Sequence, residues 1–247
     1  MRRIGLLPGD ALSMRADGFT LIELAVALFV MALLLGSLLV PLTTQVEQKQ
    51  TAETQRTLDD IKEALLGYAL ANGHLPCADV SSGHGANDGV EDVAPDGTCA
   101  APEGNLPWVS LSAPPADLWG NRFRYRVDGE FSQRAPAAPL TLASSADVRV
   151  CAAAGCAAPL TSTGPNGAVA IILSHGKNGR GAVSASTNAP NAAPAGADES
   201  ENANANATFV SRAPTPAGAS AGEFDDIVSW LSKYVLYSRM VTAGLLP

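Results

Sequence analysis

The first pattern in the chain is an apolar run that becomes amphipathic without a break. The run Leu24–Leu42 holds nineteen residues and no charge, and as a helix it spans roughly 28 Å, close to the hydrocarbon thickness of a bilayer. The chain then turns polar, but apolar residues recur at steps of three and four, which predicts one buried helical stripe. That stripe comprises Leu58, Ile61, Leu65, Tyr68 and Ala69.

These two patterns together predict one long helix over residues 19–71, which ends at Asn72–Gly73 because glycine is a common residue just past a helix end. Its first half, residues 19–42, is apolar all round, and its second half, residues 43–72, is amphipathic. The second half needs a partner sheet on one side. A plain membrane anchor followed by a separate stalk helix is the alternative.

Short strand signals follow the helix. Phe123, Tyr125 and Val127 alternate with two arginines, which is typical of a half-buried strand. Residues 146–153 and 167–176 are two further strand candidates, and the second is more apolar and therefore more central.

Long stretches between these signals lack periodicity. Glycine, proline, aspartate and asparagine dominate residues 73–107, which indicates a loop. Residues 181–222 are rich in alanine, asparagine, proline and serine, and we expect a long exposed loop there. Apolar residues in 223–241 predict a short helix or strand that packs back on the core. The expected fold is α+β, with a long N-terminal helix packed on a small antiparallel sheet.

The net charge of the chain and the positions of its first arginines indicate which partners it excludes and on which side of a membrane each part lies. The net charge is −8 and no basic stripe with interleaved aromatic residues occurs, so nucleic acid is not an expected partner. Arg2, Arg3 and Arg15 precede the apolar run. The positive-inside rule then keeps the N-terminus cytoplasmic and places residues 73–247 in the periplasm or outside the cell.

The four cysteines, Cys77, Cys99, Cys151 and Cys156, all follow the apolar run. They allow three pairings, and proximity in sequence favours Cys77–Cys99 and Cys151–Cys156. An exported location permits disulfides. Free thiols, or a zinc site with His74 and His84, are the alternatives, although the spacing matches no usual zinc pattern.

No catalytic constellation is recognisable. Ser174 and His175 are adjacent within a glycine-rich segment, and neighbouring residues on a strand point to opposite faces, so they would not form a nucleophile–base pair. The sequence contains only three histidines, and it lacks a G-x-S-x-G elbow, a phosphate loop and a zinc-helix motif. We therefore expect no enzymatic activity.

The segment GFTLIELAVAL at residues 18–28 resembles the N-terminus of type IV pilins and of type II secretion pseudopilins. The resemblance implies that a membrane peptidase cuts between Gly18 and Phe19, removing residues 1–18 as a leader. The same enzyme would then methylate the new terminal amine of Phe19. Glu23 becomes the fifth residue of the mature chain, and Pro41 corresponds to the kink of the family's helix.

The resemblance also gives Glu23 a role. A carboxylate in hydrocarbon is costly, about 2.5–3.5 kcal/mol on insertion scales. In a filament, the carboxylate can meet the positive amine of a neighbouring Phe19, so that neither charge is left unpaired. A glutamate that reaches the membrane surface from an isolated anchor is the alternative.

A second resemblance covers the later part of the chain. DLWGNRFRYRV, and the segments from ILSHGKNGRG to EFDDIVSW, are similar to the major pseudopilin, in which the last region holds a structural calcium. Hard oxygen ligands suit calcium, and solvated acidic loops are the alternative. The candidate ligands here are Asp198, Glu199, Glu201, Asp225 and Asp226, with Asn202 beside them. A further acidic cluster contains Asp88, Glu91, Asp92 and Asp96.

Together these features predict a structural subunit of a secretion pseudopilus or a surface pilus, and a minor subunit rather than the bulk one because the long loops would hinder dense packing. Its expected partners are other subunits, the prepilin peptidase, the inner-membrane assembly platform and, before assembly, membrane lipid. Calcium is the one cofactor that the sequence suggests. The alternative is a membrane-anchored periplasmic binding or adhesion module that does not polymerise.

Overall fold

The structure is a computed structural model that describes residues 20–80, 87–137 and 139–246, without the side chains of residues 36–43. It divides into two compact units, Met1–Gln48 and Lys49–Pro247. The predicted cleavage site, Gly18 and Phe19, lies outside the described residues.

Helix α1, Leu21–Asn72, is the longest element and extends into both units. It ends where the sequence predicts. Gly73 takes a left-handed backbone conformation with φ +79, and its N–H donates to the Ala69 carbonyl at 2.8 Å, which is the usual way a glycine closes a helix. Position 41 lies inside α1, and the kink at Pro41 stays a prediction. Among the described residues, no helix combines the length and apolarity needed to cross a membrane.

The second unit is built on a four-stranded antiparallel sheet with the strand order β1-β2-β4-β6. Every residue of β4 is buried and the strand lies inside the sheet, which confirms the prediction of a central strand. In β2, Tyr125 and Val127 are buried while the two arginines are half-buried, as the alternation predicted. The strands are β1 Glu103–Asn105, β2 Arg124–Val127, β4 Ala168–Ser174 and β6 Ile227–Ser232.

A second, two-stranded parallel sheet pairs β3 with β5, and four shorter helices complete the unit. The C-terminal segment forms both a strand and a helix, β6 followed by α5. These elements are β3 Arg149–Cys151, β5 Thr208–Val210, α2 Trp108–Leu111, α3 Gly129–Ser132, α4 Ala197–Ala203 and α5 Lys233–Thr242.

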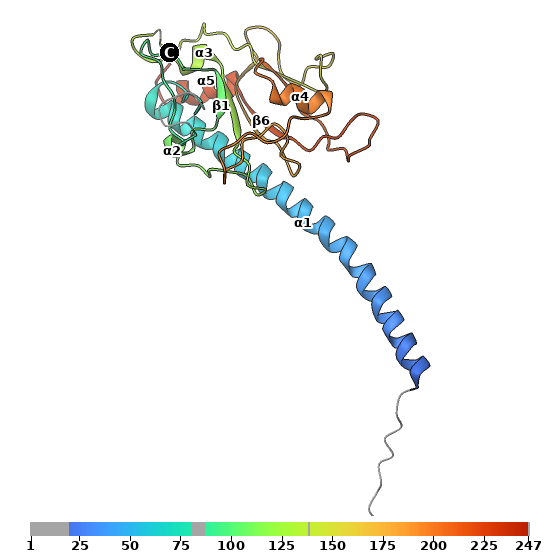
Figure 1. The fold of residues 1–247 in the computed structure, drawn as a ribbon. Helices are drawn as coiled ribbons and strands as arrows, with labels where there is room; N and C mark the ends of the chain where they lie inside the picture. Colours follow the sequence, from blue (N-terminus) through green and yellow to red (C-terminus); the bar gives the residue numbers. More distant parts are fainter. Residues whose placement is uncertain (1–19, 81–86, 138, 247) are drawn as a thin grey trace, which may run out of the picture. The chain divides into compact units, whose positions relative to one another are not determined.

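The two faces of the main sheet bury different partners. On one face, the predicted stripe of α1 packs in one core with Phe123, Tyr125 and Ile172; the C-terminal turns of α1 are turquoise in Figure 1. On the other face, Ile171 and Leu173 pack with residues of β3 and β5. The described structure is therefore α+β, with an antiparallel sheet that has the amphipathic part of a long helix on one side.

The segment 181–222, predicted as one long exposed loop, instead contains α4 and β5. Asn202 is fully buried, and its side chain donates to the Val210 carbonyl at 2.9 Å and accepts the Val210 N–H at 2.6 Å. An asparagine that pairs with backbone in this way gives no hydrophobic periodicity, so the low-complexity composition conceals an ordered segment. Similarly, β1 lies within residues 73–107, which the sequence indicated as loop.

The stripe on α1 leads to a stability prediction. Leu65 has no exposed surface, so Leu65→Ala is expected to lower the free energy of unfolding by about 2–5 kcal/mol through lost burial and a cavity. The measurement is a urea titration of the full chain in mild detergent, followed by tryptophan fluorescence. Val109→Ala is the control, because Val109 is 55% exposed and its loss is expected to change stability by no more than about 0.5 kcal/mol. Equal effects of the two substitutions would contradict this packing.

Candidate functional sites

The start of α1 is closed by two residues of the predicted assembly motif. The Thr20 N–H and hydroxyl both donate to one carboxylate oxygen of Glu23, at 2.9 Å and 2.8 Å, and the Glu23 N–H donates back to the Thr20 hydroxyl at 3.3 Å. This reciprocal arrangement is a capping box, which satisfies N–H groups that the first helical turn leaves unpaired. In the chain by itself, the Glu23 carboxylate therefore binds its own helix start.

Both disulfides that sequence proximity favoured are present. Cys77 pairs with Cys99 and Cys151 with Cys156, with Cα–Cα distances of 5.2 Å and 5.1 Å. No cysteine remains free. The first bridge closes the segment that follows α1, and the second closes the turn after β3.

The acidic cluster near the first disulfide does not form a cation site among the described residues. Glu91 accepts from the Tyr68 hydroxyl at 2.6 Å and from Arg134 at 2.6 Å. Asp92 accepts from the Val80 N–H, while Asp88 and Asp96 each cap a local turn. These carboxylates point to separate protein donors, so they act as structural hydrogen-bond acceptors.

Three of the five predicted calcium ligands come together at one end of the main sheet. Glu199, Asp225 and Asp226 each offer a carboxylate oxygen within 4.8 Å of the other two. The other two candidates bind elsewhere: Asp198 accepts from Arg212 at 2.6 Å, and Glu201 accepts from two asparagine side chains at 3.0 Å and 3.1 Å.

Strand register and a glycine position this cluster. Ser174 at the end of β4 pairs with Ile227 at the start of β6, so the residues just beyond the two strand ends lie next to each other, and Glu199 approaches from α4. Gly176 has φ +59, and a Cβ added there would lie 2.3 Å from the Asp225 carbonyl oxygen. Only glycine fits this backbone conformation and this close approach.

Each of the three carboxylates has one oxygen anchored and one oxygen without a hydrogen-bond partner. Asn178 donates to Glu199 from its side chain at 3.0 Å and to Asp225 from its backbone at 2.7 Å. Asn202 donates to Asp226 at 2.8 Å. The remaining oxygens are buried and have no hydrogen-bond partner among the described residues; they are Glu199 Oε2, Asp225 Oδ1 and Asp226 Oδ1. A buried group of oxygen ligands held in this way fits a calcium ion.

The electrostatics of the cluster agree with that fit. Burial, helped by the neighbouring charges of Asp226 and Glu199 and opposed by the hydrogen bond from the Asn178 N–H, raises the pKa of Asp225 to about 7. Burial also raises the pKa of Glu199. Two buried acids and one half-buried acid at this spacing resist being ionised together, and a divalent cation removes that repulsion.

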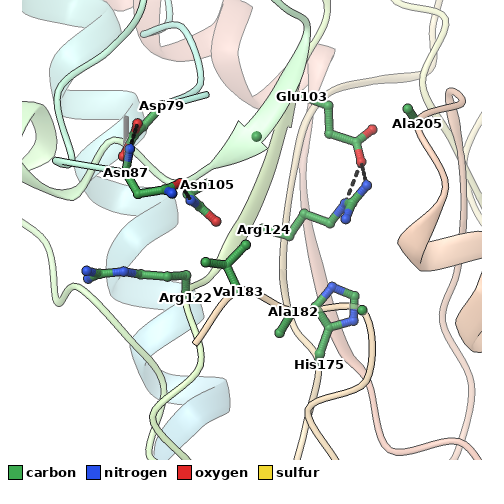
Figure 2. Close-up of a pocket in the computed structure, with 12 residues that line it drawn as sticks. Asp79, Asn87, Glu103, Asn105, Arg122, Arg124, His175, Ala182, Val183 and Ala205 are labelled. Carbon is green, nitrogen blue, oxygen red and sulfur yellow. Dashed lines mark hydrogen bonds and ion pairs between the residues drawn. The ribbon is translucent and has the colours of Figure 1, made fainter. Parts of the chain in front are cut away.

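A pocket of about 140 Å³, lined by both polar and apolar residues, opens beside this cluster (Figure 2), between β1, β2 and the loop after β4. Glu103 pairs with Arg124 on one wall, and Asp79 lies with Asn87 on another. His175 lines the pocket from below in this view. Its neighbour Ser174 donates its hydroxyl to Asp117 at 2.6 Å, while the His175 ring lies beside Asp226.

Comparison with known proteins gives one match, at the N-terminus. Residues 13–39 are a prokaryotic N-terminal methylation motif. This motif points to a processed, type IV pilin-like protein, made as a membrane-anchored precursor, cut by a prepilin peptidase and assembled with other pilin subunits. No curated protein and no solved structure matches the chain.

Two residues at the acidic cluster, Asn178 and His175, could not be assigned to it from the sequence. Asn178 contacts two of the three acids, but nothing in a glycine-rich segment identifies one asparagine as a support. The sequence gives His175 no catalytic role beside Ser174 and suggests no other role; in the structure it is fully buried with Nδ1 3.4 Å from Asp226 Oδ1. The glycines of HGKNG were the available signal, since they indicate a backbone that approaches another segment closely.

Proposed function

We propose that this protein is a structural subunit, and a minor one, of a type II secretion pseudopilus or a type IV pilus. The methylation motif at residues 13–39 carries the proposal. Three features support it: the long helix α1, the Thr20–Glu23 arrangement at its start, and a disulfide-bonded α+β unit. Subunits would associate through the apolar half of α1, whose described residues from Leu21 to Leu35 are exposed.

The proposed path begins in the inner membrane, with the N-terminus cytoplasmic and the second unit periplasmic. The prepilin peptidase cuts after Gly18, the assembly platform receives the mature chain, and the subunit leaves the lipid for the filament. The net charge of −8 does not suit a nucleic-acid partner. The role needs no catalytic turnover.

The test of this function is the identity of the mature N-terminus. Cells that express the full chain with a pilin-type peptidase should yield a protein that begins at N-methylated Phe19, and Gly18→Ala should leave essentially all of it with its leader attached. Intact-protein mass spectrometry separates these forms. A chain that keeps Met1 would instead indicate the membrane-anchored binding module, and a cut after the apolar run would indicate an ordinary secretion signal.

We also propose that Glu199, Asp225 and Asp226 hold a structural calcium ion. The three buried oxygens without hydrogen-bond partners support this proposal. The ion would tie α4 to the start of β6, and so join the low-complexity segment to the main sheet. Its role would be structural, since calcium here neutralises charge and fixes backbone.

A further inference from the structure

The imidazole ring of His175 is buried against the acidic cluster. Its side chain has no exposed surface, and neither ring nitrogen has a hydrogen-bond partner among the described residues. A buried polar group in this state is costly, about 1–3 kcal/mol. Its Nδ1 lies 3.4 Å from Asp226 Oδ1.

On the side that faces His175, one carboxylate oxygen of Asp226 has no hydrogen-bond donor among the described residues. Its Oδ2 accepts from Asn202 at 2.8 Å, whereas its Oδ1 accepts no hydrogen bond. A carboxylate oxygen has two lone pairs, so Oδ1 can bind a cation and accept an N–H at the same time. The 3.4 Å separation exceeds that of a well-formed N–H···O bond, about 2.9 Å, by a few tenths of an ångström.

We propose that His175 is a positioning residue for the calcium site: its neutral imidazole donates Nδ1–H to Asp226 Oδ1 and fixes the direction of that ligand. With Asn202 holding one oxygen and His175 the other, the carboxylate cannot rotate away from Glu199 and Asp225. The other ring nitrogen, Nε2, is left for water from the pocket that His175 lines in Figure 2. This inference rests on the proposed calcium site.

The place of His175 in the chain gives the contact its geometry. His175 directly follows Ser174, the last residue of β4, and Asp226 directly precedes Ile227, the first residue of β6. Ser174 and Ile227 are paired in the sheet register. The ring and the carboxylate are therefore held by a rigid strand pair. Outer contacts of this kind typically change metal affinity by about 10–100-fold when they are removed.

The experiment compares two substitutions of nearly the same shape in the full chain in detergent micelles. His175→Asn keeps an N–H donor near the position of Nδ1, and His175→Leu has none. Calcium affinity by isothermal titration calorimetry is expected to fall about tenfold or more in His175→Leu and to stay within about threefold of wild type in His175→Asn. His74→Gln is the control, because His74 contacts the Leu75 carbonyl, outside the cluster.

The outcomes separate this inference from the calcium site itself. If both variants bind calcium as tightly as the wild type, His175 is only a packing residue and the inference fails while the site stands. If the wild type binds no calcium, the site fails first. A direct check avoids any folding defect: histidine-specific ¹⁵N NMR of the calcium-loaded wild type should show Nδ1 of His175 carrying its proton, and an unprotonated Nδ1 would overturn the proposal.

Discussion

A chain that carries Glu23→Ala is expected to lose its leader and gain its methyl group as the wild type does, yet to be nearly absent from filaments. The substitution leaves the positive amine of each neighbouring Phe19 without its counter-charge in a low-dielectric bundle. Breaking a buried ion pair from one side costs about 3–5 kcal/mol, which corresponds to a hundredfold or more in an equilibrium. The measurement is the fraction of variant subunit in sheared and pelleted filaments, by immunoblot.

The capping box makes a sharper comparison possible. Glu23 accepts two hydrogen bonds from Thr20, so the alanine variant also loses its half of the capping box. Glu23→Gln keeps a capping side chain, since glutamine serves at this position of a capping box, but it removes the charge. We expect Glu23→Gln to fail in assembly almost as fully as Glu23→Ala. Normal incorporation of the glutamine variant would mean that the cap, and not the charge, is what assembly requires.

This comparison follows from a proposed exchange of partners, of which the structure shows the first, Thr20. In the separate chain, Thr20 satisfies the carboxylate locally, which lowers the penalty of an acid near the start of an apolar helix. In a filament, the amine of a neighbour would offer a full charge in place of neutral donors, and charge-assisted hydrogen bonds are about twice as strong. The free energy gained on assembly would therefore be the difference in strength between the Glu23 carboxylate's contact with the neighbour's amine and its hydrogen bonds from Thr20.

Periodic parts of the fold could be predicted from the sequence because one physical cause dominates there. The stripe from Leu58 to Ala69 and the alternation around Tyr125 both record which side of an element is buried, and burial decides their structure. The end of α1 at Gly73 was equally readable, because a left-handed residue is needed there. The paired cysteines followed from proximity along the chain.

Other parts could not be predicted because their causes are single polar contacts that leave no pattern in the sequence. The order of α4 and β5 depends on Asn202 bonding the backbone eight residues away, and such pairs leave no period in the sequence. The acidic cluster joins α4 to residues that precede β6, so composition could suggest five ligands but not select three. Asp198 binds Arg212 and Glu201 binds Asn204, and the sequence alone does not indicate either contact.

Because the structure brings together only three of the five candidate ligands, substitutions at these positions give the calcium proposal its strongest test. Calcium at about 100 times its dissociation constant should stabilise the folded chain by roughly 2.7 kcal/mol, which for a domain of this size corresponds to about 5–10 °C in Tm. Asp225→Asn should lose most of this shift, because it removes a charged ligand while the amide oxygen can still accept the Asn178 N–H. Differential scanning fluorimetry with and without a chelator measures the shift.

Glu201→Gln is the matched control, and it decides between a specific site and general neutralisation of an acidic loop. Glu201 lies on the same helix as Glu199 and was equally plausible from sequence, but its carboxylate binds Asn204 and Asn206. A cation that merely screens the loop would respond alike to the loss of either charge. A cation held by the three unpartnered oxygens should ignore Glu201→Gln and respond to Asp225→Asn. An equal loss in both variants, or no calcium shift in the wild type, would remove the site.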